Sequence, residues 1–379
     1  MPAAARTSEP FKELFSRALV EDMARHLKRA WKAFDEKRFT DAALNDFKSL
    51  ELKARAQQIA GALKVTLPSD IPRALQVIVL TLRPLDKAGE PMDDPTKGLA
   101  GWAIWPMGEY VAQNGLDHPE ESLAVLRALT IRSTSEFALR PFLVKHPKKT
   151  LATLKTWAKD ANHHVRRLVS EGSRPRLPWG LRLKDFVQDP APLLPLLESL
   201  RDDASDYVRR SVANSLNDIA KDHPDLVAGI AKAWLKDAPK DRARLIRHAC
   251  RTLIKAGHGK TLAALGYSAP KIKLKFRLDT ARVEYGGHAV FSAEIENLAN
   301  KRQNLVIDYI IHHQKKSGAR TPKVFKWKAL TLAPKEKRTL ERRHALKPIT
   351  TRVYYPGRHR VEITVNGQVM AGAEFDLRL

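Results

Sequence analysis

The sequence predicts a mainly α-helical protein in two parts: a HEAT-like α-solenoid followed by a C-terminal immunoglobulin-like β-sandwich. Apolar residues keep a helical spacing from Phe11 to about residue 268, and one segment of this region is repeated. After about residue 270, apolar and polar residues alternate, which is the period of a half-buried strand. We therefore expect a disordered lead-in over residues 1–10, a helical repeat domain over 11–268 and an immunoglobulin-like domain over 269–379.

The net charge indicates a polyanionic partner. The 379 residues include 67 Lys and Arg against 42 Asp and Glu, a net charge of +25, and 43% are hydrophobic. The hydrophobic fraction supports packed cores, and the acidic residues are too numerous for a disordered basic tail. A folded protein with such an excess most often binds a polyanion, so DNA or RNA is the first choice and an anionic membrane surface the second.

Neither a disulfide nor a membrane span is expected. Cys250 is the only cysteine, and its apolar neighbourhood predicts a buried, inert thiol. The first residues lack the continuous apolar run of a signal peptide, and no window reaches the roughly 18 apolar residues of a transmembrane helix. The protein is therefore expected in the cytoplasm, without membrane association.

The first elements along the chain are short helices. Apolar residues recur at helical intervals over residues 11–82, interrupted by prolines, and the polar segment 87–98 predicts a loop. Helices are expected again over 101–111 and 119–145. Three aromatic residues of the first of these two helices are assigned to the core: Trp102, Trp105 and Tyr110.

An internal repeat defines the rest of the helical region. His146–Asp160 aligns with His223–Asp237 without a gap at an offset of 77 residues. Between them, Val165-Arg166-Arg167 recurs 43 residues later as Val208-Arg209-Arg210. A period near 40 residues built from helix pairs is typical of a HEAT-like solenoid. Trp157 and Trp234 occupy equivalent repeat positions and are interpreted as core residues.

The last region has the pattern of a small β-sandwich. About seven short alternating strands fit the roughly 110 residues after residue 268, and Asn366-Gly367 predicts a type I′ hairpin turn. From Lys271 to Leu379 there are 23 Lys and Arg against 10 Asp and Glu, so this region carries 13 of the 25 surplus positive charges. Its expected loops are basic. We interpret it as a second DNA-binding module, with Lys315, Lys316 and Arg320 as contacts.

The segment 160–180 (DANHHVRRLVSEGSRPRLPWG) has an unusual combination of residues. A helix is expected to end at Gly172, which leaves Glu171 in the last turn, where a carboxylate faces the negative end of the helix dipole. A basic, proline-containing loop follows and presents Trp179. An anion, an aromatic face and several guanidiniums within ten residues make a poor core segment, but they suit a cationic base on a nucleic acid.

Four segments resemble the AlkC branch of the AlkC/AlkD-like DNA alkylation-repair glycosylases. They are LELKAR at 50–55, LTIRSTSEFALRPF at 129–142, the segment 160–180 with its SEGSRPRLPWG motif, and the helix Val208–Asp218. The resemblance covers the helical region, and a C-terminal β domain is what distinguishes the AlkC branch. It implies a HEAT-like solenoid that holds bent duplex DNA and hydrolyses the N-glycosidic bond of cationic N3-alkylated bases, mainly 3-methyladenine. It also implies that the base is not flipped into a deep pocket.

The resemblance implies a catalytic cluster of Glu136, Glu171 and Asp218, with Trp179 beside the lesion. The chemistry is consistent with this set, because a base that is already cationic needs no protonation to leave. The enzyme must then stabilise an oxocarbenium-like sugar and orient a water molecule, and carboxylates can do both. Glu171 is our choice for the main electrostatic group or water activator. The alternative is a surface carboxylate paired with Arg174 or Arg167.

Three of these residues also have other interpretations. Asp218 follows a stripe of small polar residues on its helix, which leaves room for a sugar to approach, but it could be a solvated carboxylate. Glu136 supports the water or the other carboxylates, or else it pairs with Arg140 four residues later. Trp179 contacts the lesion, or else it joins two solenoid repeats.

Phosphate contacts are assigned to six arginines, each of which could instead pair with an acidic neighbour: Arg166, Arg167, Arg174, Arg176, Arg209 and Arg210. His163-His164 and His312-His313 are the nearest approach to metal-ligand pairs. Neither has an i,i+4 spacing or a third ligand at helical distance, so no metal is expected. No glycine-rich phosphate loop is present, no lysine has the context of a Schiff base, and no cofactor is expected.

Taken together, the sequence predicts a monofunctional DNA-3-methyladenine glycosylase, a monomer whose partner is double-stranded DNA containing alkylated bases. The alternative is a non-catalytic helical-repeat scaffold that binds nucleic acid or protein. In that case the three carboxylates would be scattered over the surface.

Overall fold

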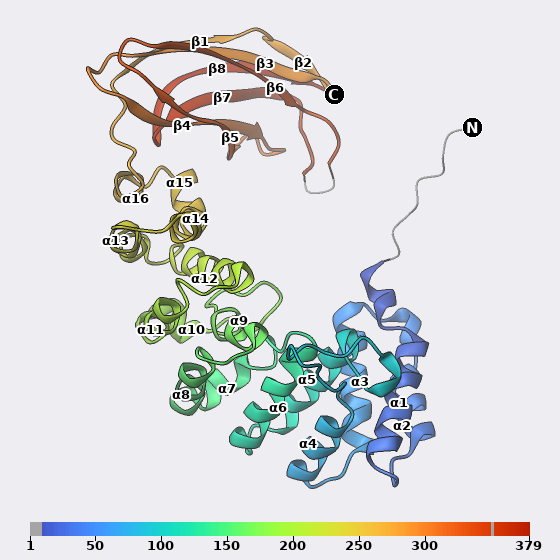
Figure 1. The fold of residues 1–379 in the computed structure, drawn as a ribbon. Coiled ribbons are helices and arrows are strands. Elements are labelled where there is room, and N and C mark those ends of the chain that lie inside the picture. The colour runs from blue at the N-terminus through green and yellow to red at the C-terminus, as the bar shows by residue number, and fades with distance from the viewer. Residues whose placement is uncertain (1–9, 350–351) are drawn as a thin grey trace. The chain divides into compact units, whose positions relative to one another are not determined.

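The fold was established from a computed structural model that describes residues 10–349 and 352–379 (Figure 1). Residues 1–9 of the expected lead-in lie outside the described residues. The chain divides into two compact units, Met1–Asp218 and Ile219–Leu379. None of the described helices combines the length and apolar character needed to cross a membrane.

The first unit is built from helices that pack on their neighbours in sequence. They are α1 (Arg17–Ala30), α2 (Glu36–Leu44), α3 (Leu52–Thr66), α4 (Ile71–Leu80), α5 (Ile104–Asn114), α6 (Pro119–Arg132), α7 (Arg140–Lys145), α8 (Pro147–Trp157), α9 (His163–Gly172), α10 (Lys184–Gln188), α11 (Leu194–Ser199) and α12 (Asp206–Ile219), whose last residue lies in the second unit. Helix α2 packs on α1 and α3, α5 on α6, and α8 on α7 and α9. A helical region was predicted here, and it is confirmed.

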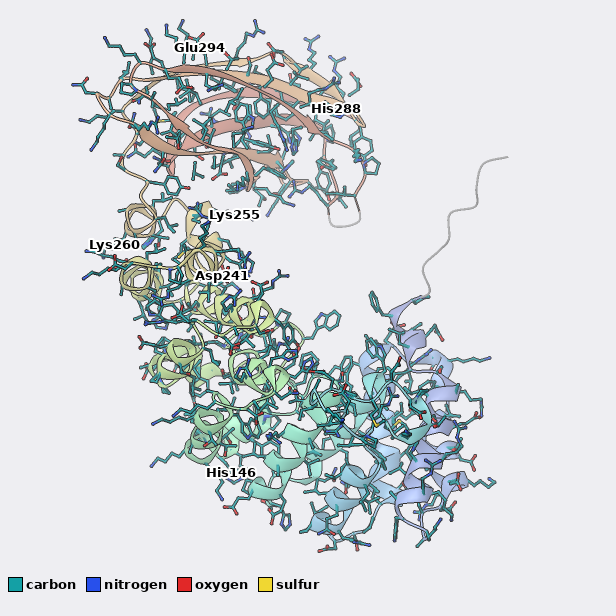
Figure 2. All side chains as sticks on the ribbon, viewed as in Figure 1. His146, Asp241, Lys255, Lys260, His288 and Glu294 are labelled. Carbon is teal, nitrogen blue, oxygen red and sulfur yellow. The ribbon has the colours of Figure 1, made fainter. Side chains whose placement is uncertain are left out.

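The sequence repeat is reflected in local structure. Helix α8 follows His146, which is labelled in Figure 2, and α13 (Pro224–Leu235) follows His223. The two histidines have nearly equal backbone angles, φ −130° and ψ 55° against φ −127° and ψ 63°, and each precedes a proline in the first turn. Trp157 and Trp234 are both buried. Their predicted place in the core is therefore confirmed.

Helix α9 begins and ends where the sequence indicates. The Asn162 side chain caps it by accepting a hydrogen bond from the His164 N–H at 2.8 Å. The helix ends at Gly172, which has no positive φ. A Cβ at Gly172 would lie 2.6 Å from Leu139 Cδ2, so a larger residue would force this leucine side chain to shift, and the glycine serves close packing rather than a left-handed cap.

The second unit begins with helices and continues as two β-sheets. After α13 come α14 (Lys240–Ala249), α15 (Arg251–Lys255) and α16 (Gly259–Ala264). The strands are β1 (Ile272–Leu278), β2 (Arg282–Glu284), β3 (His288–Asn297), β4 (Gln303–Gln314), β5 (Arg320–Leu332), β6 (Lys337–Ala345), β7 (Gly357–Val365) and β8 (Gln368–Arg378). One sheet has the order β1-β3-β6 and the other β2-β8-β7-β4-β5. The two compact units meet after Asp218, upstream of the domain boundary predicted at residue 268. Residue 268 lies between α16 and β1, where the helices give way to strands. The predicted domain boundary itself stays a prediction.

The sandwich core is formed by inward-facing residues of both sheets, and Phe291, Tyr309, Ile363 and Phe375 are among its fully buried members. The structure describes eight strands where about seven were expected. The short β2, which pairs in parallel with β8, is too brief to show alternation in the sequence. Cys250 is buried as predicted, and burial raises the pKa of its thiol to about 11.

The predicted hairpin joins β7 to β8. Asn366 and Gly367 have φ of 47° and 78°, as a type I′ turn requires. The Asn366 amide donates to the Ser268 carbonyl at 2.7 Å, and its Oδ1 accepts from the Val306 N–H at 2.8 Å. A Cβ on Gly367 would lie 2.5 Å from Cα of Gly257, so the turn needs glycine for its approach to this neighbour as well as for its φ.

Candidate active site

An arginine joins two of the predicted carboxylates. Arg174, in the loop after α9, donates from Nη1 to Glu171 Oε1 at 2.6 Å and from Nε to Asp218 Oδ2 at 2.8 Å. All three side chains are buried, with 5% of Glu171, 8% of Arg174 and 1% of Asp218 exposed. Burial opposes the charge of Arg174, but the hydrogen bonds and negative charges of Asp218 and Glu171 outweigh it and raise the Arg174 pKa. The structure thus holds a charged triad inside the first unit.

Hydroxyl groups fix the second oxygen of Glu171. Ser211 Oγ donates to Glu171 Oε2 at 2.7 Å, and Ser170 Oγ hydrogen-bonds Ser211 Oγ at 2.7 Å. Ser211 lies on α12, one of the small polar residues that the sequence places in the stripe leading to Asp218. Each carboxylate can accept about four hydrogen bonds, so the Glu171 contacts described here leave capacity for a water molecule or a cation.

Glu136 joins the same network through a second arginine. It lies in the turn between α6 and α7 and pairs with Arg167, which also approaches Glu171 Oε1 at 3.6 Å through Nη2. Arg167 additionally donates from Nη1 to Thr134 Oγ1 at 3.0 Å. The ion pair of Glu136 described in the structure is with Arg167 and not with Arg140, the alternative partner considered from the sequence. The two bridging arginines therefore draw residues from three helical segments into one cluster.

Arg140 instead holds the loop that follows α9. It is fully buried, and it donates from Nη1 to the Gly172 carbonyl at 2.8 Å and from Nε to the Leu181 carbonyl at 2.5 Å. These carbonyls lie at the two ends of the segment that carries Arg174 and Trp179. Burial, followed by the nearby charge of Arg174, lowers the Arg140 pKa to about 10. Arg140 thus clamps the loop in one conformation.

A hollow of about 580 Å³ opens beside the cluster. Its lining residues are Gly101, Trp102, Trp105, Ser133, Thr134, Glu136, Phe137, Glu171, Arg174, Leu177, Pro178 and Trp179. Asp218 is not among them, because Arg174 lies between it and the hollow. Its burial rules out the interpretation of Asp218 as a solvated carboxylate. Glu136 and Glu171 therefore line the hollow directly, whereas Asp218 contacts Arg174, which lines it.

Trp179 stands at the rim of this hollow in a strained conformation. It is 76% exposed and has φ of 64°, a left-handed backbone that bulky residues adopt only at a cost of about 1–3 kcal/mol. An indole so exposed does not join two repeats, so that alternative is wrong. Backbone strain concentrates at functional positions when the surrounding structure maintains it, as the Arg140 clamp does here.

The assignment of Trp102 and Trp105 to the core needs correction. Both are half-buried, unlike Tyr110, and both line the hollow. Their rings lie 6.1 Å apart, and Trp105 lies 5.4 Å from the Phe137 ring. The sequence showed these aromatics but could not show that both of them line a hollow. Arg140 was likewise visible only as part of the 129–142 motif, because its carbonyl partners lie 32 and 41 residues away.

The six arginines proposed to contact phosphate fall into different environments. Arg166 pairs with Asp203, and Arg209 donates to the carbonyls of Asp203 and Ala204, so both hold the turn before α12. Arg167 and Arg174 belong to the carboxylate cluster. Arg176 is half-buried, and Arg210 is exposed and pairs with Asp206. Arg210 is therefore the most accessible of the six to a phosphate.

The β-sandwich exposes basic residues along two edge strands. Lys315, Lys316 and Arg320 are exposed. Lys315 and Lys316 lie between β4 and β5, whereas Arg320, expected in a loop, is the first residue of β5 and pairs with Glu374. Beyond them, β5 exposes Lys323, Lys326 and Lys328, and β6 exposes Arg338, Arg342 and Arg343. The two strands belong to different sheets, and the rings of Phe325 and His344 lie 4.7 Å apart where they approach each other. Lysines on an edge strand also hinder edge-to-edge pairing, which gives them a structural role as well.

Comparison with known proteins gives consistent results for both regions. Residues 130–253 match the model of a DNA alkylation repair enzyme family, and residues 273–379 match the C-terminal immunoglobulin-like domain of the uncharacterised protein YhaZ. The chain is 38% identical over 369 residues to YhaZ of Bacillus subtilis (strain 168), covering 97% of this chain and 99% of that protein. It is also similar to a Pseudomonas fluorescens alkylpurine DNA glycosylase, AlkC, solved bound to DNA containing an abasic site analog. That match has a TM-score of 0.86 and 36% identity, over 97% of this chain and 99% of the other.

Proposed function

Because the chain belongs to the AlkC-type family of DNA alkylation repair proteins, with a helical N-terminal region and an immunoglobulin-like C-terminal domain, we propose that it is a DNA glycosylase. Its substrate would be double-stranded DNA carrying cationic N3-alkylated bases, mainly 3-methyladenine. The observation that carries this proposal is the joining of Glu136, Glu171 and Asp218 by two arginines beside a hollow with an exposed tryptophan. The reaction is hydrolysis of the N-glycosidic bond without a cofactor.

The chemistry of this substrate matches such a cluster. An N3-alkylated purine already carries a positive charge, so it can leave as a neutral base without an acid to protonate it. The sugar then becomes oxocarbenium-like, and it needs a nearby anion and a positioned water molecule. Arg167 and Arg174 pair with the three carboxylates, and the charge of the nearby Arg140 also acts on them. Glu136 and Glu171 line the hollow, so their carboxylates are the anions that a sugar cation would meet there.

Each residue has a separate role in this proposal. Glu171 holds the sugar cation or activates water through an oxygen that reaches the hollow. Glu136, also at the hollow, helps to orient the water. Asp218 acts through Arg174, whose position it fixes. Trp179 offers an aromatic face to the cationic base, an interaction worth about 0.5–2 kcal/mol.

The arrangement supports recognition of the lesion without deep base flipping. Trp179 is at the rim of the hollow and strongly exposed, so an alkylated base could meet it while remaining close to the duplex. The helical region would act as a HEAT-like solenoid that holds the DNA, and Arg210 would contact a phosphate of the DNA backbone. The basic strands β5 and β6 would provide a second phosphate contact. Both contacts predict DNA affinity that falls steeply with salt concentration.

The second candidate function is a scaffold that binds DNA without chemistry. The observation that favours it is the pairing of every carboxylate of the cluster with an arginine, which is also how a purely structural network would look. The two functions differ in one measurable product. A glycosylase releases free alkylated base from methylated duplex, whereas a scaffold binds the duplex and leaves it intact.

The test is to incubate methylated duplex DNA with the protein and to measure released 3-methyladenine by mass spectrometry. Glu171→Gln keeps the size of the side chain but removes its charge and replaces one acceptor oxygen by an NH2 donor, and we expect base release to fall by about 10²–10³-fold. DNA binding should persist. The matched control is Glu198→Gln, which removes the same charge from an exposed ion pair with Arg201 and should leave release unchanged. Full activity of Glu171→Gln would remove Glu171 from the mechanism, and no release by the unmodified protein would favour the scaffold.

A further inference from the structure

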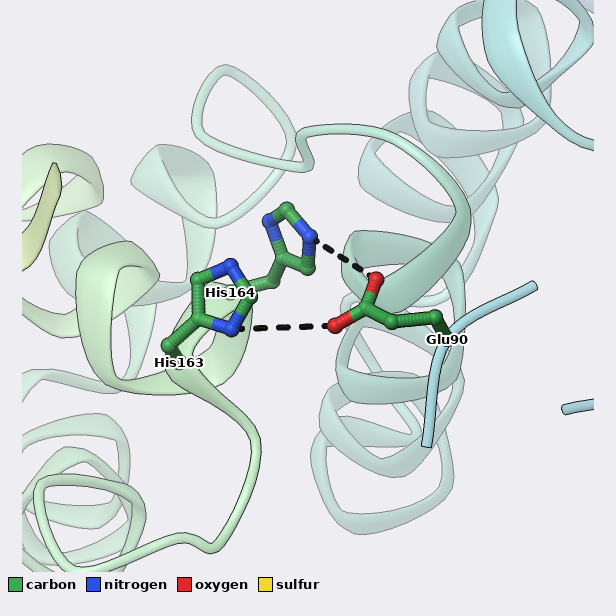
Figure 3. A group of neighbouring side chains, drawn as sticks. All are labelled: Glu90, His163 and His164. Carbon is green, nitrogen blue, oxygen red and sulfur yellow. Dashed lines mark ion pairs between the residues drawn. The ribbon is translucent and has the colours of Figure 1, made fainter. Parts of the chain in front are cut away.

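A glutamate far away in sequence meets the adjacent histidines at the start of α9. Glu90, in the loop between α4 and α5, approaches His163 Nδ1 with Oε1 at 3.7 Å and His164 Nε2 with Oε2 at 3.3 Å. Figure 3 shows the carboxylate facing both imidazoles. One ligand atom from each of the three residues lies within 4.8 Å of the others. Glu90 is 73 residues upstream of His163, so no spacing in the sequence identifies it as a third ligand for this histidine pair.

The separations suit a small divalent cation. Zinc binds imidazole nitrogen at about 2.0–2.1 Å and carboxylate oxygen at about 2.0–2.2 Å, which places tetrahedral ligand atoms about 3.3–3.5 Å apart. The separations of His164 Nε2 from Glu90 Oε2, 3.3 Å, and of His163 Nδ1 from Glu90 Oε1, 3.7 Å, are close to that range, although each histidine faces a different carboxylate oxygen. The histidines use different nitrogens because adjacent residues of a helix point about 100° apart. With Nδ1 of one and Nε2 of the other, both rings reach the same carboxylate, and their centroids lie 4.1 Å apart.

The backbone around the three side chains is held in place. The Asp86 carboxylate accepts hydrogen bonds from the N–H groups of Ala88 and Glu90 at 2.8 and 3.0 Å, which shapes the loop that presents Glu90. Asn162 fastens this loop to α9, because its amide donates to the Gly89 carbonyl at 2.9 Å while its oxygen caps the helix. Ligands on fixed backbone need little rearrangement to bind an ion.

The site is accessible, and its charge suits a cation. The three side chains are between 31% and 38% exposed, so an ion can enter from solvent. The positive end of the α9 dipole disfavours a bound cation, but the Glu90 carboxylate compensates for this. Arg167, whose charge also acts on His164, is paired with Glu136 and Glu171.

We propose that Glu90, His163 and His164 form a binding site for one divalent transition-metal ion, with Zn²⁺ the best fit. Two imidazoles and one carboxylate favour Zn²⁺, Co²⁺ or Ni²⁺ over Mg²⁺ and Ca²⁺, which prefer oxygen ligands. Three protein ligands leave a fourth position for water or another oxygen donor. The ion fastens the Glu90 loop to the helix that carries Arg167 and Glu171. This proposal does not depend on the proposed enzymatic function.

The test is metal binding by the full chain. Protein freed of metal by dialysis against a chelator is titrated with CoCl₂, and visible absorption reports the coordination of Co²⁺; ZnCl₂ then competes for the site. We expect one ion per chain, displacement of Co²⁺ by Zn²⁺, and a melting temperature that rises with Zn²⁺ concentration. Glu90→Gln, His163→Ala and His164→Ala should each weaken Co²⁺ binding by at least about tenfold.

The control variant is His312→Ala. His312 and Glu362 form another histidine–carboxylate pair, at 2.9 Å, but they belong to no group of three potential ligands in the part of the chain that the structure describes. This variant should bind Co²⁺ like the unmodified protein, and circular dichroism checks that all variants are folded. No saturable binding, or binding that all three site variants retain, would mean that Glu90 only forms ion pairs with the histidines, and the proposal would be wrong.

Discussion

The two units bury ionisable side chains in opposite ways. In the first unit, the carboxyl groups of Glu171 and Asp218 are buried, and Arg174 donates a hydrogen bond to each of them. In the β-sandwich, His313 and His344 are buried, and three of their four ring nitrogens have no hydrogen-bond partner among the described residues. Burial lowers the pKa of His313 to about 3 and that of His344 to about 4. The carboxyl groups of the first unit are thus paired with an opposite charge, whereas burial favours the neutral form of the two histidines.

This difference separates a site from a core. A buried ion pair is weak support for stability, since apolar residues of similar size often do as well, so a cluster of five charges suggests a role other than packing. Neutral histidines packed among aromatic rings need no such role. His313 lies 5.6 Å from the Tyr354 ring and 5.6 Å from the His359 ring, and it fills space there as an aromatic side chain. Three variants test whether the contrast holds.

The largest expected effect is the acid sensitivity of the β-sandwich. Unfolded His313 takes up a proton below about pH 6.5, whereas the folded residue does so only near pH 3. The unfolded state therefore binds more protons between these values, and stability present above pH 6.5 is lost as the pH falls toward 3. At 1.36 kcal/mol for each pKa unit, the loss approaches about 5 kcal/mol. His313→Leu should remove this pH dependence.

The measurement is chemical unfolding followed by the far-ultraviolet β-sheet signal at pH values between 4 and 7.5. Asp308 acts in the opposite direction, because burial raises its pKa to about 6, and Lys326 and Lys255 (Figure 2) only partly offset this. The useful quantity is therefore the difference in pH slope between His313→Leu and the unmodified protein. His288→Leu replaces an exposed histidine of the same domain and should leave the slope unchanged. Equal slopes for all three proteins would contradict the neutral burial of His313.

The next effect concerns the first unit. Arg174→Leu leaves the carboxylates of Glu171 and Asp218 buried without their shared partner, so we expect the free energy of unfolding to fall by about 3–5 kcal/mol. Arg210→Leu is the control, because Arg210 forms an exposed pair with Asp206 that is worth about 0–1 kcal/mol. Thermal and denaturant unfolding compare the two variants. Similar losses would mean that the Arg174 bridge is no stronger than a surface pair.

The structural features that the sequence predicts correctly are local ones. The end of α9 at Gly172, the repeat that α8 and α13 share, and the Asn366-Gly367 turn depend on neighbouring residues, and each was predicted. The nearness of Glu171 to Arg174 also follows from one helical turn.

Contacts between segments that are far apart in the chain could not be predicted from the sequence. The hydrogen bond from Arg140 to Leu181, the position of Trp102 and Trp105 at the hollow, and the approach of Glu90 to His163 depend on how whole helices pack. No periodicity or motif in the sequence carries that information, because the partners are many residues apart. The roles proposed for Glu136, Glu171 and Asp218 remain predictions for the same reason: their grouping depends on packing, and their chemistry awaits measurement.

The smallest expected effect on stability is at Trp179, and it distinguishes a functional tryptophan from a packed one. Trp179→Ala removes a side chain that is 76% exposed, so the free energy of unfolding should change by no more than about 0.5 kcal/mol. Under the proposed function, loss of the aromatic face costs about 0.5–2 kcal/mol of cation–π attraction, which lowers base release about 2- to 30-fold. Trp157→Ala removes a buried indole and should instead destabilise the protein by about 3–5 kcal/mol. A Trp179→Ala variant that loses as much stability as Trp157→Ala would show that the Trp179 ring is a packed residue. A variant that releases base at the normal rate would show that the ring has no part in recognising the lesion.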